Sequence, residues 1–169
     1  LKHMDASNTT LTPAVRTALN KTLDQYKDHL EFVELVSRFK LENRTPDLLS
    51  VSLHYPDSAM GKEAMKTLLE WNKTELIQKV ISEKKKEDVQ AVIKSIQPIM
   101  YDKKAMLLME LIFMDSTQNI DNRKLALRAL GGPTNSEDHL LKLASENKIP
   151  PELHITAAGV FQSAWRNCK

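Results

Sequence analysis

Residues 120–132 read IDNRKLALRALGG, and the pattern in this stretch decides the fold class. Its apolar residues recur at a spacing of i, i+1, i+4, which places them on one face of a helix. The pattern recurs without gaps in four segments: GKEAMKTLL (61–69), VQAVIKSIQ (89–97), NRKLALRAL (122–130) and LHITAAGVF (153–161). Because these segments follow one another at intervals of about 30 residues, the sequence predicts tandem helical repeats.

A second apolar pattern precedes each of these segments. Leu49, Ile77 and Leu141 each lie at the same distance ahead of the second residue of the segment that follows. In the third unit the corresponding pattern is formed by Leu107, Leu108, Leu111 and Ile112. Each unit is therefore predicted to be a helix, a short turn and a second helix.

Proline and short polar residues mark the turns between the predicted helices. Pro56 and Asp57 suit a helix stop followed by an N-terminal cap. Pro151 falls at or near the first position of the last helix, where a missing N–H group costs little. In the third unit the candidate caps and turn formers are Asp115, Ser116, Asn119 and Asp121.

Ahead of the repeats, apolar residues such as Val15, Leu19 and Leu23 recur every three or four positions. This spacing predicts one long helix or two short ones that cover the first repeat, since the terminal units of a repeat array need a cap. The expected fold is all-α: a right-handed α–α superhelix of four helix pairs over residues 45–169, behind an N-terminal cap over residues 13–44.

The chain has the length and composition of one domain. Of its 169 residues 41% are hydrophobic and 27% charged, and the formal net charge of +2 is too balanced to indicate a nucleic-acid binder. No stretch approaches the roughly 20 apolar residues of a membrane span. We expect residues 1–12 to be a vector scar and a disordered lead, residues 13–169 to be a single domain, and the whole to be a fragment of a larger protein.

Two stretches resemble HEAT repeats, whose second helix carries Pro-Asp followed by Val-Arg-x-x-Ala-x-x-Ala-Leu-Gly. These stretches are PDSAMGKEAMKTLL and IDNRKLALRALGG. The matching positions are Asp57, Lys62 and Ala64 in the first unit and Arg123, Ala126, Ala129, Leu130 and Gly131 in the third. The second unit departs from the pattern with Gln90 and Ile93, and the fourth departs with His154.

A narrower resemblance covers roughly residues 30 to 166 and rests on LVSRFKLENRTPDLLSVSLHYPDSAMGKEAMKTLLEW followed by ALRALGGPTNSEDHLLKLASENKIPPELHITAA. This order resembles the HEAT-like region of exported bacterial proteins of the haem-binding or membrane-bound dehydrogenase type, common in planctomycetes, verrucomicrobia and Bacteroidetes. The resemblance implies a non-catalytic scaffold that contacts neighbouring domains or another protein, in the periplasm or exported. The cytochrome c domain and its haem then lie elsewhere in the polypeptide. It implies no cofactor, nucleic acid or membrane insertion for this segment.

Two alternatives remain open from the sequence. One is a HEAT-like DNA glycosylase of the alkylation-repair type, which would use a basic concave groove. Its need for many convergent cations conflicts with the small net charge. The other is a free-standing cytoplasmic adaptor.

The sequence predicts no catalytic, cofactor-binding or metal site. Cys168 lacks the Cys-x-x-Cys-His pattern of haem attachment, and the histidines lack the spacing of metal ligands. The methionines at 100, 106, 109 and 114 are expected to fill the core, and Trp71 and Trp165 to pack between units. A possible binding surface on the concave face of the second helices comprises Lys62, Lys66, Gln90, Lys94, Arg123, Arg128 and His154.

Overall fold

The computed structural model describes residues 12–132 and 137–167, and this part of the chain forms ten α-helices and no strand. The expected all-α class is thereby confirmed. The helices are α1 (Pro13–Leu23), α2 (Leu30–Arg38), α3 (Thr45–His54), α4 (Ala59–Glu70), α5 (Thr74–Glu83), α6 (Lys86–Ile96), α7 (Lys103–Met114), α8 (Ile120–Leu130), α9 (Glu137–Ser145) and α10 (His154–Asn167). Three short 3-10 helices are η1 (Glu42–Arg44), η2 (Gln97–Ile99) and η3 (Pro151–Leu153).

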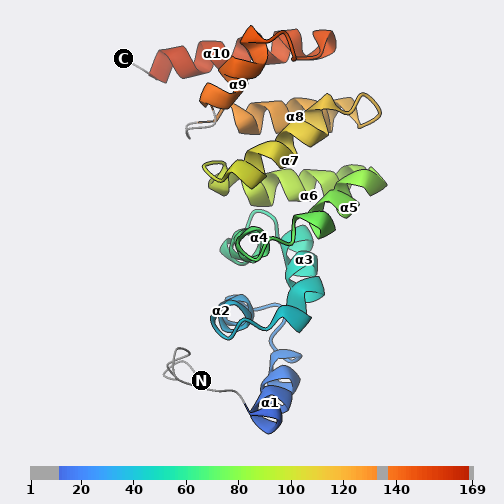
Figure 1. Ribbon diagram of the computed structural model, residues 1–169, viewed down its shortest axis with the longest axis vertical. Coiled ribbons are helices and arrows are strands. Elements are labelled where there is room, and N and C mark those ends of the chain that lie inside the picture. Colours follow the sequence, from blue (N-terminus) through green and yellow to red (C-terminus); the bar gives the residue numbers. More distant parts are fainter. Residues whose placement is uncertain (1–11, 133–136, 168–169) are drawn as a thin grey trace.

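Successive helices are stacked along one long axis, from α1 at one end to α10 at the other (Figure 1). The N-terminal region, expected as one or two helices, contains two, α1 and α2. The second helices of successive pairs contact one another in order. They are α2, α4, α6, α8 and α10.

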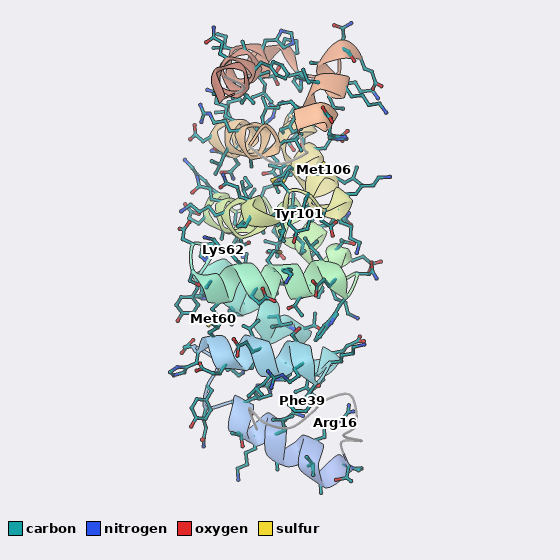
Figure 2. The ribbon with its side chains drawn as sticks, turned by 90° about the vertical axis from the view of Figure 1, so that its left-hand side faces the viewer. Arg16, Phe39, Met60, Lys62, Tyr101 and Met106 are labelled. Carbon is teal, nitrogen blue, oxygen red and sulfur yellow. The ribbon has the colours of Figure 1, made fainter. Side chains whose placement is uncertain are left out.

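The stack changes direction between α4 and α6. In Figure 1, α2 and α4 are seen end-on, whereas α6 and α8 are seen lengthwise. After the 90° turn of Figure 2 the two groups exchange appearance. Helix α6 packs against α3 as well as α4. As a result, part of the surface of α3 stays open.

Short polar side chains cap the helices. Ser58 accepts a hydrogen bond from the Gly61 amide at 3.1 Å and caps α4, so the expectation that Asp57 is the cap was wrong by one residue. Asn119 caps α8, as one of the expected candidates, by accepting from the Asp121 amide at 2.9 Å. Pro151 opens η3, which leads directly into α10.

One hydrophobic core extends from Leu19 in α1 to Val160 in α10. The repeat columns of the second helices lie inside it, as predicted. The fifth position of each segment (Met65, Ile93, Ala126 and Ala157) and the eighth (Leu68, Ile96, Ala129 and Val160) are all buried. These columns form the common interior of the last four helix pairs.

The first helices were less well predicted. Leu141, Leu107 and Leu111 are about half exposed, whereas Leu140, Leu108 and Ile112 are buried. Each residue turns a helix by about 100°, so adjacent residues face different directions, and in α7 and α9 only one leucine of each pair is buried. Which of the two does so depends on how α7 and α9 pack on α8.

Met100 and Met109 are fully buried, and Met106 and Met114 pack against the core, which confirms their predicted role. Trp71 also packs against it. The side chain of Trp165, the whole of Cys168 and residues 1–11 of the predicted lead at 1–12 lie outside the described residues.

Ion pairs join each helix pair to the next, and we call them the seam ion pairs. They are Arg44–Asp24 at 2.6 Å, Lys73–Glu42 at 2.8 Å, Lys86–Asp121 at 3.0 Å and Arg123–Glu152 at 2.7 Å. The partners in each come from consecutive pairs, at the edges of the shared core. These four basic side chains thus connect neighbouring helix pairs.

Candidate functional site

Two residues of the predicted basic surface are engaged by carboxylates. The Nζ atom of Lys66 lies 3.4 Å from Oε1 of Glu63 and 3.8 Å from Oε1 of Glu70, and the charge of Glu63 is the main cause that raises the pKa of Lys66. Lys94 on α6 donates to Asp57 at 2.9 Å. These acids reduce the positive charge that Lys66 and Lys94 could offer to an anionic partner.

Arg123 is buried and does not belong to a surface, which corrects the prediction. Its side chain is only 4% exposed. Nε donates to the carbonyl of Phe113 at 2.9 Å, and Nη1 lies 2.7 Å from Oε1 of Glu152. A guanidinium has five donors; here Nε and Nη1 have partners, whereas Nη2 is buried with no hydrogen-bond partner among the described residues. The repeat pattern places a polar residue here without revealing that the next unit covers it.

The remaining predicted residues do not share one environment. Lys62 and Gln90 are half-buried, and Arg128 is exposed. Lys62 lies on α4, in the part of the stack where the second helices run lengthwise in Figure 2. His154 is exposed, and its Nε2 donates to the carbonyl of Ile149 at 2.9 Å. The seven residues therefore do not form one uniform basic stripe.

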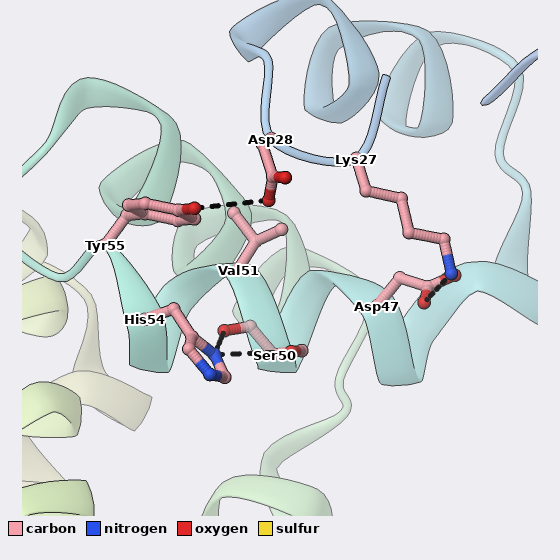
Figure 3. A pocket seen from close by; sticks show the side chains of 7 residues that line it. All are labelled: Lys27, Asp28, Asp47, Ser50, Val51, His54 and Tyr55. Atoms are coloured by element: carbon pink, nitrogen blue, oxygen red, sulfur yellow. Dashed lines mark hydrogen bonds and ion pairs between the residues drawn. The ribbon is translucent and has the colours of Figure 1, made fainter. Parts of the chain in front are cut away.

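A groove that the sequence analysis did not predict lies along α3. Two hollows of about 160 and 400 Å³ flank this helix and share Ser50 and His54. We call them together the α3 groove. Its lining is Lys27, Asp28, Pro46, Asp47, Leu49, Ser50, Val51, Leu53, His54, Tyr55 and Asp88. Figure 3 shows the smaller hollow, between α3 and the connection from α1 to α2.

The groove follows from one stripe of α3 and from the change of direction in the stack. Pro46, Leu49, Ser50, Leu53 and His54 recur at i, i+3, i+4, i+7 and i+8, which places them on one helix face. The stripe mixes apolar with polar side chains. From α6, Asp88 lines the larger hollow, and Pro46, Ser50 and His54 of the stripe are exposed.

Polar contacts hold the walls of the smaller hollow. Tyr55 donates its hydroxyl to Oδ1 of Asp28 at 3.2 Å, and this hydrogen bond is the main cause that raises the pKa of Tyr55. Lys27 donates to Asp47 at 2.9 Å, and Nε of Arg44 lies 3.0 Å from the other oxygen of the same carboxylate. Asp47 is thus neutralised by two cations, of which Figure 3 shows Lys27.

His54 and Ser50 do not form a nucleophile and base. The Nδ1 atom of His54 lies 2.8 Å from the Ser50 carbonyl, which only accepts hydrogen bonds, so Nδ1 carries the proton. The Ser50 hydroxyl lies 3.4 Å from this same nitrogen and finds no acceptor lone pair there. Nε2 is left as an acceptor. The pair therefore offers hydrogen-bonding groups to a ligand and no activated oxygen.

A third hollow, of about 410 Å³, lies between α9, η3 and α10, and its lining includes Ala144, Ile149, Ala157 and Phe161. Among the described residues no group of three or more histidine, cysteine, aspartate or glutamate side chains is placed to hold a metal ion. Within the same residues, no helix combines the length and the apolar character that crossing a membrane requires.

Comparison with protein-family models, with curated proteins and with solved structures gave no significant match.

Proposed function

We propose that this chain is a non-catalytic helical-repeat scaffold, a right-handed α–α superhelix of the HEAT/ARM-like kind that binds a partner protein or a neighbouring domain. The observation that carries the proposal is the single core shared by successive helix pairs from α1 to α10. A stack built in this way keeps a defined shape and presents a long lateral surface, which repeat proteins use for binding.

The seam ion pairs support a scaffold role. They join consecutive pairs at the edges of the core, as in Arg44–Asp24 and Arg123–Glu152. Such contacts restrict sliding of one pair against the next, because any shift separates charges that are now within hydrogen-bond distance. Groups displayed along the stack, such as those of the α3 groove, thereby keep fixed mutual positions.

The wider setting is proposed from the resemblance. In it, the module belongs to a multidomain haem-binding protein, holds a dehydrogenase-like region and a cytochrome c domain in relation to each other, and carries no cofactor itself. Its compartment is then the periplasm or the exterior. A cytoplasmic adaptor uses the same surfaces and differs in compartment.

The charge distribution disfavours the DNA-glycosylase alternative. Binding to the phosphate backbone requires several cations that converge on one groove. Here Lys66 and Lys94 are paired with carboxylates, and Arg123 is buried. A gel-shift titration at low salt tests this alternative directly, and retention of DNA at micromolar protein would favour it over the scaffold.

Site-specific photo-crosslinking in the native host tests the scaffold function. A photoreactive amino acid replaces one exposed residue at a time, at Ser50 on α3, Lys79 on α5, Leu111 on α7 and Ala158 on α10. We expect one face to give a discrete adduct, whose partner is identified by mass spectrometry and then shown to bind as a purified protein. Absence of adducts at all four positions would contradict the proposal.

A further inference from the structure

The α3 groove carries more negative than positive charge. Three carboxylates, of Asp28, Asp47 and Asp88, line it together with one ammonium group, that of Lys27. Lys27 is already bound to Asp47 at 2.9 Å. The hydrogen bond recorded for Asp28 comes from the neutral hydroxyl of Tyr55, and the cation nearest Asp88 is the exposed Lys85 at 3.9 Å. Asp28 is therefore available for a cationic ligand, and Asp88 holds one ion pair, with Lys85, that a cationic ligand would share or replace.

Apart from the Ser50 hydroxyl, which can also donate, the free polar atoms described here are hydrogen-bond acceptors. The carboxylates of Asp28 and Asp88 accept only, and Nε2 of His54 accepts because Nδ1 holds the proton. Lysine and arginine side chains are the matching groups, since they only donate. A phosphate or carboxylate ligand would meet repulsion at both ends of the groove.

The floor between the two carboxylates is apolar. Leu49 and Leu53 are partly buried against the core and line the larger hollow together with Pro46. Asp28 belongs to the smaller hollow and Asp88 to the larger, so the two acids lie on opposite sides of the α3 stripe. A ligand that satisfies this surface has separated positive charges with apolar groups between them.

We propose that the α3 groove binds a short segment of a partner protein in which two basic residues flank apolar ones. This inference rests on the proposed function as an interaction module and names the chemistry of its partner. The segment crosses α3 from one carboxylate to the other, and a helix with its side chains is about 10–12 Å wide. An extended segment rises about 3.3 Å per residue, so three or four residues cover it. One basic side chain binds Asp28, and the other binds Asp88.

Fluorescence anisotropy with labelled peptides tests the proposal. The probe is the capped peptide Arg-Leu-Leu-Arg extended by glycines, and the matched control is Glu-Leu-Leu-Glu with the same extension. We expect the basic peptide to bind at least tenfold more tightly than the acidic one, and its affinity to fall with added salt because the charges are near the surface. Equal affinities for the two peptides would overturn the proposal.

The variant Asp28→Asn/Asp88→Asn tests whether these two carboxylates bind the basic residues of the peptide. It should bind the basic peptide about fivefold more weakly, since exposed ion pairs each contribute modestly. The control Glu34→Gln/Glu75→Gln removes the same charge from exposed positions on α2 and α5 and should leave affinity unchanged. Equal losses in both double variants would show a nonspecific charge effect and overturn the site. Circular dichroism confirms that each variant folds.

NMR mapping of the bound peptide distinguishes failure of the groove proposal from failure of the scaffold proposal. Shift changes confined to α3, the α1–α2 connection and the start of α6 support the groove. Changes elsewhere on the chain refute the groove and leave a scaffold function standing. If no peptide binds while photo-crosslinking still yields a partner, the proposed chemistry is wrong and the scaffold is retained. If photo-crosslinking also yields no partner, the proposed scaffold function is contradicted as well.

Discussion

Arg123 on α8 contacts Glu152 of the following helix pair, with Nη1 2.7 Å from Oε1, and its own side chain is almost completely buried. The same guanidinium donates from Nε to the carbonyl of Phe113 at the end of α7. Arg123 thus links both helices of its own pair to the next pair. A residue expected on a binding surface is instead a structural connection between helix pairs.

Replacement of Arg123 should therefore destabilise the chain. Arg123→Ala removes a bond to the Phe113 carbonyl and leaves a cavity, and we expect a loss of about 2 kcal/mol in the free energy of unfolding. Urea unfolding followed by circular dichroism measures the change. The matched variant Arg128→Ala, at an exposed position of the same helix, should change stability by less than about 0.5 kcal/mol. Equal effects of the two variants would show that burial of Arg123 is not important.

Gly131 allows α8 to approach α10 closely. A Cβ atom at this position would lie 1.9 Å from Cγ1 of Val160. Gly131→Ala should reduce the free energy of unfolding by about 1–3 kcal/mol through overpacking. In the double variant Gly131→Ala/Val160→Ala the two losses should be less than additive by about 1 kcal/mol, because the shortened side chain makes room. Strict additivity in this double-mutant cycle would contradict the contact.

Gly61 offers a contrasting case at the start of α4. A Cβ atom there would lie 2.0 Å from the backbone carbonyl oxygen of Tyr55. Since a backbone atom cannot be shortened by mutation, we expect Gly61→Ala to destabilise by about 2 kcal/mol or more. Truncation of the neighbouring side chain in Tyr55→Ala should not rescue it. Thermal unfolding of the two single variants and the double variant tests this expectation.

Stability should fall in acid because the seam ion pairs depend on ionised carboxylates. Hydrogen bonds from Arg44, Lys73 and Lys86 are the main causes that lower the pKa values of their partners, which are Asp24, Glu42 and Asp121. The unfolded chain then binds more protons than the folded chain as these groups titrate. The contribution is present above the ordinary carboxyl range of about 4 and is lost as the pH falls through the lower folded pKa values.

Urea midpoints measured between pH 7 and pH 2 check this dependence. The variant Asp24→Asn/Glu42→Gln/Asp121→Asn should show a shallower decline in acid than the unaltered chain. High salt should reduce the difference, since these carboxylates are exposed. An identical pH profile for both proteins would show that the seam ion pairs do not contribute to stability.

Lys40 ends the first helix pair in a left-handed backbone conformation, with φ 46°. Glycine adopts this conformation without the steric penalty of a Cβ atom. Lys40→Gly should therefore stabilise the chain by about 0.5 kcal/mol, whereas Lys79→Gly within α5 should destabilise it by about 1 kcal/mol. Thermal unfolding compares the two. Destabilisation by both changes would indicate that the side chain of Lys40 matters more than its backbone.

Much of the local structure could be predicted from the sequence. The i, i+1, i+4 pattern correctly placed Met65, Ile93 and Ala126 in the core. Asn119 was correctly included among the caps. These features depend on residues within one or two helical turns of each other, so the chain order contains the necessary information. The all-α class follows from them, because each unit repeats the same local pattern.

Only the tertiary structure decided which neighbour covers each helix face. It buried Arg123 beneath Glu152, turned Leu140 rather than Leu141 toward the core, and opened the groove along α3 where α6 changes direction. The sequence by itself determined that each helix has an apolar face and that polar turn residues separate the helices. The hydrophobic period does not specify the packing partner, because that choice depends on contacts between residues about 30 positions or more apart.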